Sequence, residues 1–145
     1  MIKDVLDINL NERLLRQTTE SVYFTEDGRL PEGTRRLIEN MITTMKAHGA
    51  VGLAAPQVNE PLRIIVVDAK ACCALDGVVL SDTISSPLVL VDPVITGLSK
   101  RLAIHKEGCL SIPGYETEVE RPACVTVRGL TPQQQPFTVE AGGLL

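Results

Sequence analysis

A helical pattern between Pro31 and Gly49 places the strongest constraint on how this chain can fold. Its apolar side chains recur every three or four residues, at Leu37, Ile38, Met41, Ile42 and Met45. That spacing puts them on one face of an α-helix, with charged and polar side chains opposite. Proline is typical of a helix start, and glycine of a helix end. The rest of the chain must therefore provide an apolar surface for this helix.

Most of the sequence after this helix predicts strands. Residues 62–67 form a β-branched run that we expect to be buried on both faces. The other predicted elements, in chain order, are a short helical turn over 9–16 capped by Asn9 or Asn11, a strand over 88–91 that continues at 93–95, strands over 101–106, 117–127 and 137–140, and a turn over 130–136. One α+β domain spanning residues 1–145 is predicted, with residues 69–87 as a surface excursion.

The composition excludes several classes of protein. A net charge of −4 and an aromatic content of 3% argue against a nucleic-acid partner, because such sites need basic stripes and stacking rings. The apolar runs are far too short for a membrane span, and the N-terminus lacks the apolar core of a signal peptide. We therefore expect a cytoplasmic protein with no membrane partner.

Four cysteines, Cys72, Cys73, Cys109 and Cys124, show no C-x-x-C spacing and are expected to be thiols. In extended backbone, the neighbouring Cys72 and Cys73 would point to opposite faces, which disfavours a shared metal ion.

Two motifs stand out as chemically informative. Residues 107–114 read Glu-Gly-Cys-Leu-Ser-Ile-Pro-Gly, which sets Cys109 between a flexible Gly108 and a turn-forming Pro113-Gly114. A thiolate there could bind a metal, act as a nucleophile or fill space. Residues 50–57 read Ala-Val-Gly-Leu-Ala-Ala-Pro-Gln, whose small residues let two backbones approach and whose Gln57 supplies an amide donor.

In this order and spacing, the two motifs resemble those of the peptide deformylase family. The resemblance implies an α+β fold with small antiparallel sheets around a long amphipathic helix. The family's third motif, His-Glu-x-x-His on a C-terminal metal-binding helix, has no counterpart, since no His-Glu pair occurs in the sequence. We therefore expect a domain that lacks this helix and is incomplete at its C-terminal end.

The resemblance also implies an activity and a set of site residues. Deformylases remove the formyl group from the N-formylmethionine of nascent polypeptides, using a divalent metal, commonly iron(II), with nickel, zinc or cobalt as other candidates. Cys109 would be the thiolate ligand of that metal. The side-chain amide of Gln57 and the backbone N–H of Leu110 would stabilise the developing oxyanion.

The same resemblance implies that the N-formylmethionyl peptide is bound through Val51, Gly52 and Gly108. From their charges alone, Glu107 and Arg121 are also expected to pair.

Several departures from the family pattern bear on these expectations. Ala50 replaces the usual first glycine, and Asn59 stands where glycine is frequent, which is tolerable because asparagine enters left-handed conformations readily. Two of three metal ligands and the catalytic glutamate are missing, and we do not expect His48 or His105 to converge on Cys109. The sequence therefore predicts that metal is absent or weakly bound and that these 145 residues are inactive or nearly so.

Three interpretations remain open. The first is a metal-dependent deformylase, and the second is a non-catalytic relative that binds a peptide N-terminus or a protein partner. The third is a thiol hydrolase with Cys109 as nucleophile and His105 as base. Without the family's last helix, we expect four side chains to face a groove that a second copy or another protein covers: Leu53, Ile64, Val66 and Cys124.

Overall fold

The computed structural model of the protein describes residues 1–71 and 86–142. In this part of the chain the elements follow in the order α1 (Ile8–Leu15), α2 (Glu32–Ala47), β1 (Gly52–Ala54), the 3₁₀ turn η1 (Ala55–Val58), β2 (Ile64–Val67), β3 (Leu88–Leu98), β4 (Leu102–Cys109), β5 (Ile112–Pro122), β6 (Cys124–Leu130) and β7 (Pro136–Gly142). This arrangement confirms the predicted α+β class.

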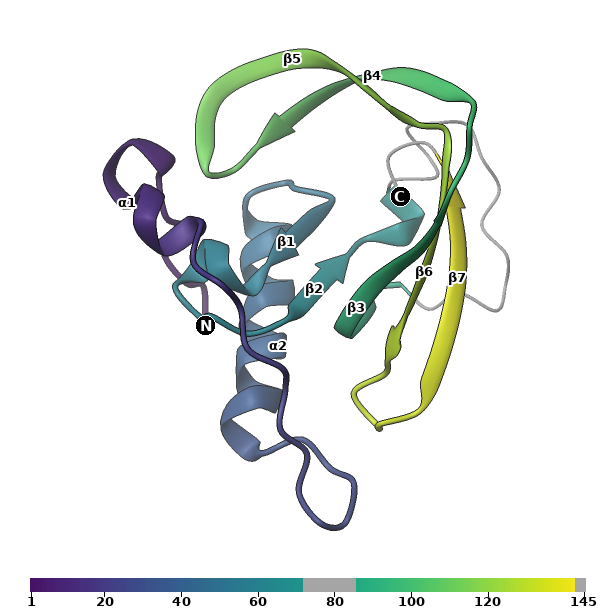
Figure 1. The fold of residues 1–145 in the computed structure, drawn as a ribbon. Coiled ribbons are helices and arrows are strands. Elements are labelled where there is room, and N and C mark those ends of the chain that lie inside the picture. The colour runs from purple at the N-terminus through teal and green to yellow at the C-terminus, as the bar shows by residue number, and fades with distance from the viewer. Residues whose placement is uncertain (72–85, 143–145) are drawn as a thin grey trace.

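Two antiparallel sheets make up the β structure. The larger sheet has the strand order β1-β2-β3-β6-β7, and the smaller one is the β4–β5 hairpin. The hairpin extends from the end of β3 back over β1, as Figure 1 shows in green, while β6 and β7 continue the larger sheet on the other side. Most residues of β5 are exposed, whereas those of β4 largely alternate between exposed and half-buried positions. The tip of the hairpin lies close to Gln57, which follows β1.

Helix α2 packs its apolar face against β1 and β2, as its periodicity predicts. Met41 and Met45 are fully buried in the same cluster as the strand residues. Gly49 adopts a left-handed φ of 63°, and the N–H of Ala50 bonds the carbonyl of Met45 at 3.0 Å. These contacts form a Schellman end, which terminates the helix and turns the chain directly into the 50–57 motif.

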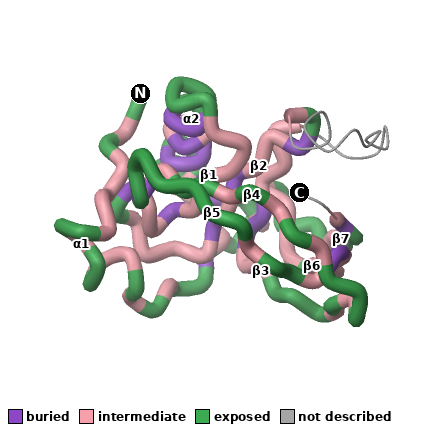
Figure 2. The backbone as a smooth tube through the Cα atoms, turned by 90° about the horizontal axis from the view of Figure 1, so that it is seen from above, coloured by how far each residue is buried: buried purple, intermediate pink, exposed green. Residues whose placement is uncertain are grey.

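The predicted groove beneath the motifs is wrong for three of its four residues. Leu53, Ile64 and Val66 are at most 1% exposed, because they pack against helix α2 and its neighbours. Cys124 is half-buried. The burial map in Figure 2 places the buried positions around α2, β1 and β2, and the exposed ones along β4 and β5. Exposed apolar side chains are found on other strands, at Ile95 and Leu98 of β3 and at Leu102 and Ile104 of β4.

Other sequence-based boundaries also need correction. The first helix is capped by the side chain of Asp7, which accepts from the N–H of Asn9, and not by Asn9 or Asn11. The predicted strand over 117–127 is two strands, because β5 ends at Pro122 and β6 begins at Cys124. The last predicted strand, over 137–140, is longer than expected, since β7 spans Pro136–Gly142.

The vicinal Cys72-Cys73 pair, most of the predicted 69–87 excursion, and residues 143–145 lie outside the described residues. Among the helices of the described ranges, none combines the length and apolar character needed to cross a bilayer.

Asp68 links the end of β2 to both borders of the segment over 72–85. Its carboxylate accepts from the N–H of Ala71 at 3.1 Å and from the hydroxyl of Ser86 at 2.9 Å. Two hydrogen bonds hold the pKa of Asp68 below its ordinary value of 3.8. The one from the Ala71 N–H has the larger effect, and the one from the Ser86 hydroxyl the smaller. These bonds favour the ionised carboxylate in the folded state.

We therefore predict that Asp68→Asn lowers the free energy of unfolding relative to the wild type, by an amount that depends on pH. A depressed folded-state pKa contributes stability that is present above the unfolded-state pKa and is lost as the pH falls through the folded-state value. The difference in free energy of unfolding between the two proteins should thus have its largest value at pH 6–7 and decrease below about pH 4. Urea unfolding between pH 7 and pH 3 measures it, and a difference that stays constant over this range would show that the charge of Asp68 is irrelevant.

Candidate active site

Gln57 is held in place by the short turn η1, which follows β1 directly. Its side-chain Oε1 accepts from the backbone N–H of Ala54 at 2.9 Å. Asn59 ends the turn with φ at 62° and ψ at 33°, so the left-handed conformation expected of this asparagine is observed. Because Oε1 is committed to an N–H donor, the Nε2 of Gln57 must point the other way, and its two protons are directed at other acceptors.

The second half of the site is the tip of the β4–β5 hairpin. Cys109 is the last residue of β4 and pairs with Ile112 across a turn made by Leu110 and Ser111. Its thiol is exposed, as the motif indicates, whereas Ser111 is only 4% exposed. The turn therefore comes before Pro113-Gly114, which lies within β5 with Gly114 at a φ of 74°. The prediction that Pro113-Gly114 forms the turn beside Cys109 is wrong.

The two motifs meet at the side chain of Gln57. Its Nε2 lies 3.7 Å from Sγ of Cys109 and 3.3 Å from Oγ of Ser111. Gln57 and Cys109 are 52 residues apart in sequence, so the fold itself makes this contact. An amide donor beside an exposed thiol, with its orientation fixed by Ala54 and Ser111, is suited to hydrogen-bond a carbonyl oxygen that replaces the thiol as the acceptor of one Nε2 proton.

The predicted pairing of Glu107 with Arg121 is confirmed. Nε and Nη2 of Arg121 donate to the two carboxylate oxygens of Glu107, at 2.6 and 2.7 Å, in a bidentate arrangement. The Arg121 guanidinium holds the pKa of Glu107 below its usual range, and the charge of His105 lowers it further by a smaller amount. This pair joins β4 to β5 two residues before Cys109 and so restrains the hairpin tip.

The other predicted site residues lie in or next to the strands β1 and β4, which lead into the Gln57 and Cys109 segments. Leu110 occupies the turn next to Cys109, outside both strands of the hairpin. Val51 precedes β1 and its carbonyl accepts from the N–H of Asp68 at 2.8 Å, while Gly52 pairs with Val67 in the sheet. A Cβ at Gly108 would meet Glu116 at 3.5 Å, which is ordinary van der Waals contact. Steric crowding therefore does not require glycine at position 108.

The residues described do not by themselves fit a catalytic metal. Within residues 1–71 and 86–142, no group of three or more His, Cys, Asp or Glu side chains is placed to share an ion. His105 lies on the same strand as Cys109 but four residues away, roughly 13 Å along the backbone. His48 is the exposed C-terminal cap of α2. Cys109 can thus supply one thiolate ligand, but the described residues do not bring two further ligands to the same ion.

Sequence reasoning missed the structural part played by Ser111. This serine is part of the cysteine motif, but the sequence pattern alone predicts no role for it. In the structure its buried hydroxyl accepts from Gln57, and its carbonyl accepts from the N–H of Ile8 at 2.9 Å. A serine inside an otherwise apolar turn, Leu-Ser-Ile, was the available signal, because a buried hydroxyl requires a hydrogen-bond partner.

Comparisons with known proteins agree with this geometry. The family model described as polypeptide deformylase matches residues 3–145. A peptide deformylase from Azotobacter vinelandii is 40% identical over 114 residues, which cover 79% of this chain and 61% of that protein. One from Thermosynechococcus vestitus is 38% identical, covering 94% of this chain and 65% of its own length. The chain therefore spans less than two thirds of the length of these two relatives.

Solved structures give the same result. A peptide deformylase from Synechococcus elongatus in complex with actinonin is 34% identical, with a TM-score of 0.79 over 98% of this chain and 68% of that one. The Met-Ala-Ser-bound class I type b enzyme from Acinetobacter baumannii is 26% identical, with a TM-score of 0.82 over 99% of this chain and 85% of that one. By motif, fold and overall similarity, this chain belongs to the polypeptide deformylase family.

Proposed function

We propose that this protein serves in the removal of the formyl group from the N-formylmethionine of nascent polypeptides. The observation that carries the proposal is the convergence of Gln57 and Cys109, with Nε2 3.7 Å from Sγ. Family membership supports the reaction class, since peptide deformylases are in general metal-dependent hydrolases of formylated peptides. The proposed substrate is an N-formylmethionyl peptide, and the cytoplasm, where nascent chains emerge, is the proposed location.

In this proposal the 145 residues supply the part of the site that binds and polarises the formyl group. The Nε2 of Gln57 and the N–H of Leu110 donate to the formyl oxygen as negative charge develops on it. Because Ala54 and Ser111 fix the orientation of Gln57 beforehand, little reorganisation is needed during the reaction. Val51, Gly52 and Gly108 bind the peptide backbone alongside, and residues 1–145 act as one domain.

Water activation is the step that these described residues do not supply. In the family a divalent metal, iron(II) or another such as nickel, zinc or cobalt, performs it, and here Cys109 would be its thiolate ligand. Since the described residues place no group of three His, Cys, Asp or Glu side chains around one ion, we propose that metal binding by these 145 residues alone is weak.

The proposal predicts the outcome of a deformylation assay. The 145-residue chain, loaded anaerobically with iron(II) or nickel(II), should hydrolyse a formyl-methionyl peptide no faster than its Cys109→Ala variant. Release of formate is the measured quantity. Turnover that is clear in the wild type and disappears in Cys109→Ala would contradict the proposal that these 145 residues bind metal only weakly, and would show that other residues of the chain complete the ligand set of Cys109.

A non-catalytic relative that binds a peptide N-terminus is the alternative function. It is favoured by the same preorganised amide, which can hold a carbonyl without hydrolysing it. Selective binding of formylated peptide without turnover is expected from both proposals. Equal binding of formylated and free peptides would contradict the role of Gln57 in both, because the formyl carbonyl would then contribute nothing to binding. A thiol hydrolase is disfavoured, because His105 is too far along β4 to act as the base for Cys109.

The exposed apolar residues of β3 and β4 suggest a covered surface in the functional protein. Ile95, Leu98 and Ile104 are each more than 60% exposed. We propose that a second copy of the chain covers them, and a sedimentation coefficient that does not change with protein concentration would contradict this dimer.

A further inference from the structure

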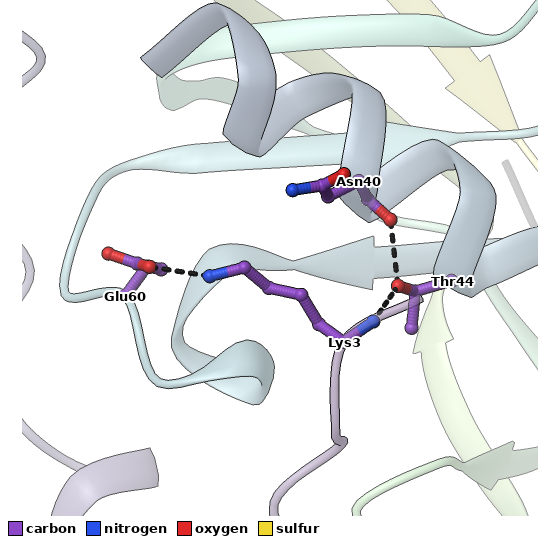
Figure 3. A network of polar contacts seen from close by, with 4 residues as sticks. All are labelled: Lys3, Asn40, Thr44 and Glu60. Carbon is purple, nitrogen blue, oxygen red and sulfur yellow. Dashed lines mark hydrogen bonds and ion pairs between the residues drawn. The ribbon is translucent and has the colours of Figure 1, made fainter. Parts of the chain in front are cut away.

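The first residues of the chain are anchored on helix α2. The backbone N–H of Lys3 donates to Oγ1 of Thr44 at 2.9 Å, and its Nζ reaches Oε1 of Glu60 at 2.6 Å (Figure 3). Thr44 is fully buried, and its hydroxyl donates to the carbonyl of Asn40 at 2.7 Å. Because the one hydroxyl proton is used on Asn40, the oxygen of Thr44 is oriented to accept from Lys3.

A few residues later, the same segment reaches both halves of the candidate site. The N–H of Leu6 donates to the carbonyl of Gln57 at 2.8 Å, and the N–H of Ile8 donates to the carbonyl of Ser111 at 2.9 Å. Gln57 and Ser111 are 54 residues apart in sequence and are also joined through their side chains. Leu6 and Ile8, two positions apart in one short segment, therefore hydrogen-bond the backbones of both motifs.

We propose that residues 3–8, here called the N-terminal strap, position Gln57 relative to Cys109. This inference rests on the proposed function and adds a positioning role outside both motifs. Leu6 and Ile8 are two residues apart, which corresponds to about 7 Å of extended chain. The strap thereby sets the separation between the Gln57 and Ser111 backbones, while the Thr44 anchor keeps it from sliding. A donor held in this way needs less reorganisation when it binds a carbonyl.

The variant Ile8→Pro tests the strap with little disturbance elsewhere. Ile8 is the first residue of α1, a position where proline is favoured because its missing N–H has no helical partner. Asp7 before it has φ −84° and ψ 131°, the extended conformation that a following proline requires. The substitution replaces the N–H that donates to Ser111 by the Cδ of the proline ring, which breaks the 2.9 Å hydrogen bond and displaces the Ser111 carbonyl. The matched control Ile8→Ala removes the side chain but keeps that N–H.

Two readouts separate positioning from general destabilisation. Hydrogen exchange of residues 107–112 should be roughly 2- to 12-fold faster in Ile8→Pro than in Ile8→Ala, as expected for one lost hydrogen bond. Exchange of β6 should be the same in both. The NMR signal of the Gln57 side-chain amide should move toward that of a free amide in Ile8→Pro only. Unchanged exchange and an unmoved Gln57 signal would overturn the proposal.

A second pair of variants tests the remote anchor. Thr43 and Thr44 both donate to the carbonyl four residues earlier in α2, but only Thr44 also accepts from Lys3. Thr44→Val should therefore speed exchange at residues 107–112, whereas the exposed control Thr43→Val should not. An equal response to both would contradict the strap.

Neither readout depends on enzymatic activity. If wild-type protein fails to prefer a formylated peptide but Ile8→Pro still loosens Gln57, the proposed function fails and the strap stands. If the preference is present and Ile8→Pro leaves both Gln57 and the preference unchanged, the strap fails and the proposed function stands.

Discussion

Leu53→Ala should lower the free energy of unfolding by roughly 2–5 kcal/mol, the largest effect we expect from a single substitution in this chain. Leu53 is 1% exposed at the centre of β1, where it belongs to the cluster formed by α2 and β2. Truncation removes buried apolar surface and leaves a cavity. The strand β1 cannot move to fill it, because β1 is paired with β2. Urea unfolding followed by circular dichroism measures the change.

The matched control is Leu10→Ala, because Leu10 is 83% exposed on α1. Its effect should stay within about 0.5 kcal/mol, as for most surface substitutions. The comparison also tests whether Leu53 is packed in the core or faces a groove. If Leu53 faced an open groove, both truncations would have similarly small effects, and that result would contradict the observed packing.

Gly129→Ala should destabilise the larger sheet by about 1–3 kcal/mol, because there is no room for a methyl group. A Cβ at this position of β6 would lie 2.9 Å from the carbonyl oxygen of Val91 and 3.2 Å from the ring of Phe137. The first of these atoms belongs to the backbone of β3, so the clash cannot be relieved by a side-chain rotation. Thermal and urea unfolding both report the loss.

The same substitution in α2 is expected to have the opposite sign. A Cβ at Gly33 would meet nothing within 4 Å, and alanine is favoured over glycine in a helix by up to about 1 kcal/mol. Gly33→Ala should therefore stabilise the protein slightly. Destabilisation of equal size by both variants would indicate that the effect at position 129 is not steric.

The sequence was sufficient to predict the features that depend on local pattern. The periodicity of α2 predicted its buried face, and Gly49 predicted its end, because both follow from helix geometry. The two motifs correctly indicated that Gln57 and the Cys109 segment come together, and the opposite charges of Glu107 and Arg121 correctly indicated their pairing. The predicted roles of these residues in binding and catalysis stay predictions.

Features that depend on tertiary packing could not be predicted from local sequence pattern. Ile64 and Val66 were expected to face a groove, but apolar side chains on a strand do not reveal which of two layers covers them. The N-terminal strap was missed because its contacts to Gln57 and Ser111 are made by backbone N–H groups, which every residue except proline carries. Such contacts leave no residue-type signal.

The central claim is that Gln57, held beside Cys109, recognises a formyl carbonyl. It is tested most directly by calorimetric titration of the 145-residue chain with formyl-Met-Ala-Ser and with unformylated Met-Ala-Ser. The wild type and the exposed-glutamine control Gln133→Leu should bind the formylated peptide more tightly. Gln57→Leu should reduce this preference by roughly 2- to 12-fold, as expected for one lost neutral hydrogen bond, because the N–H of Leu110 still donates. Equal affinity of the wild type for both peptides, or a preference that is undiminished in Gln57→Leu, would contradict the account.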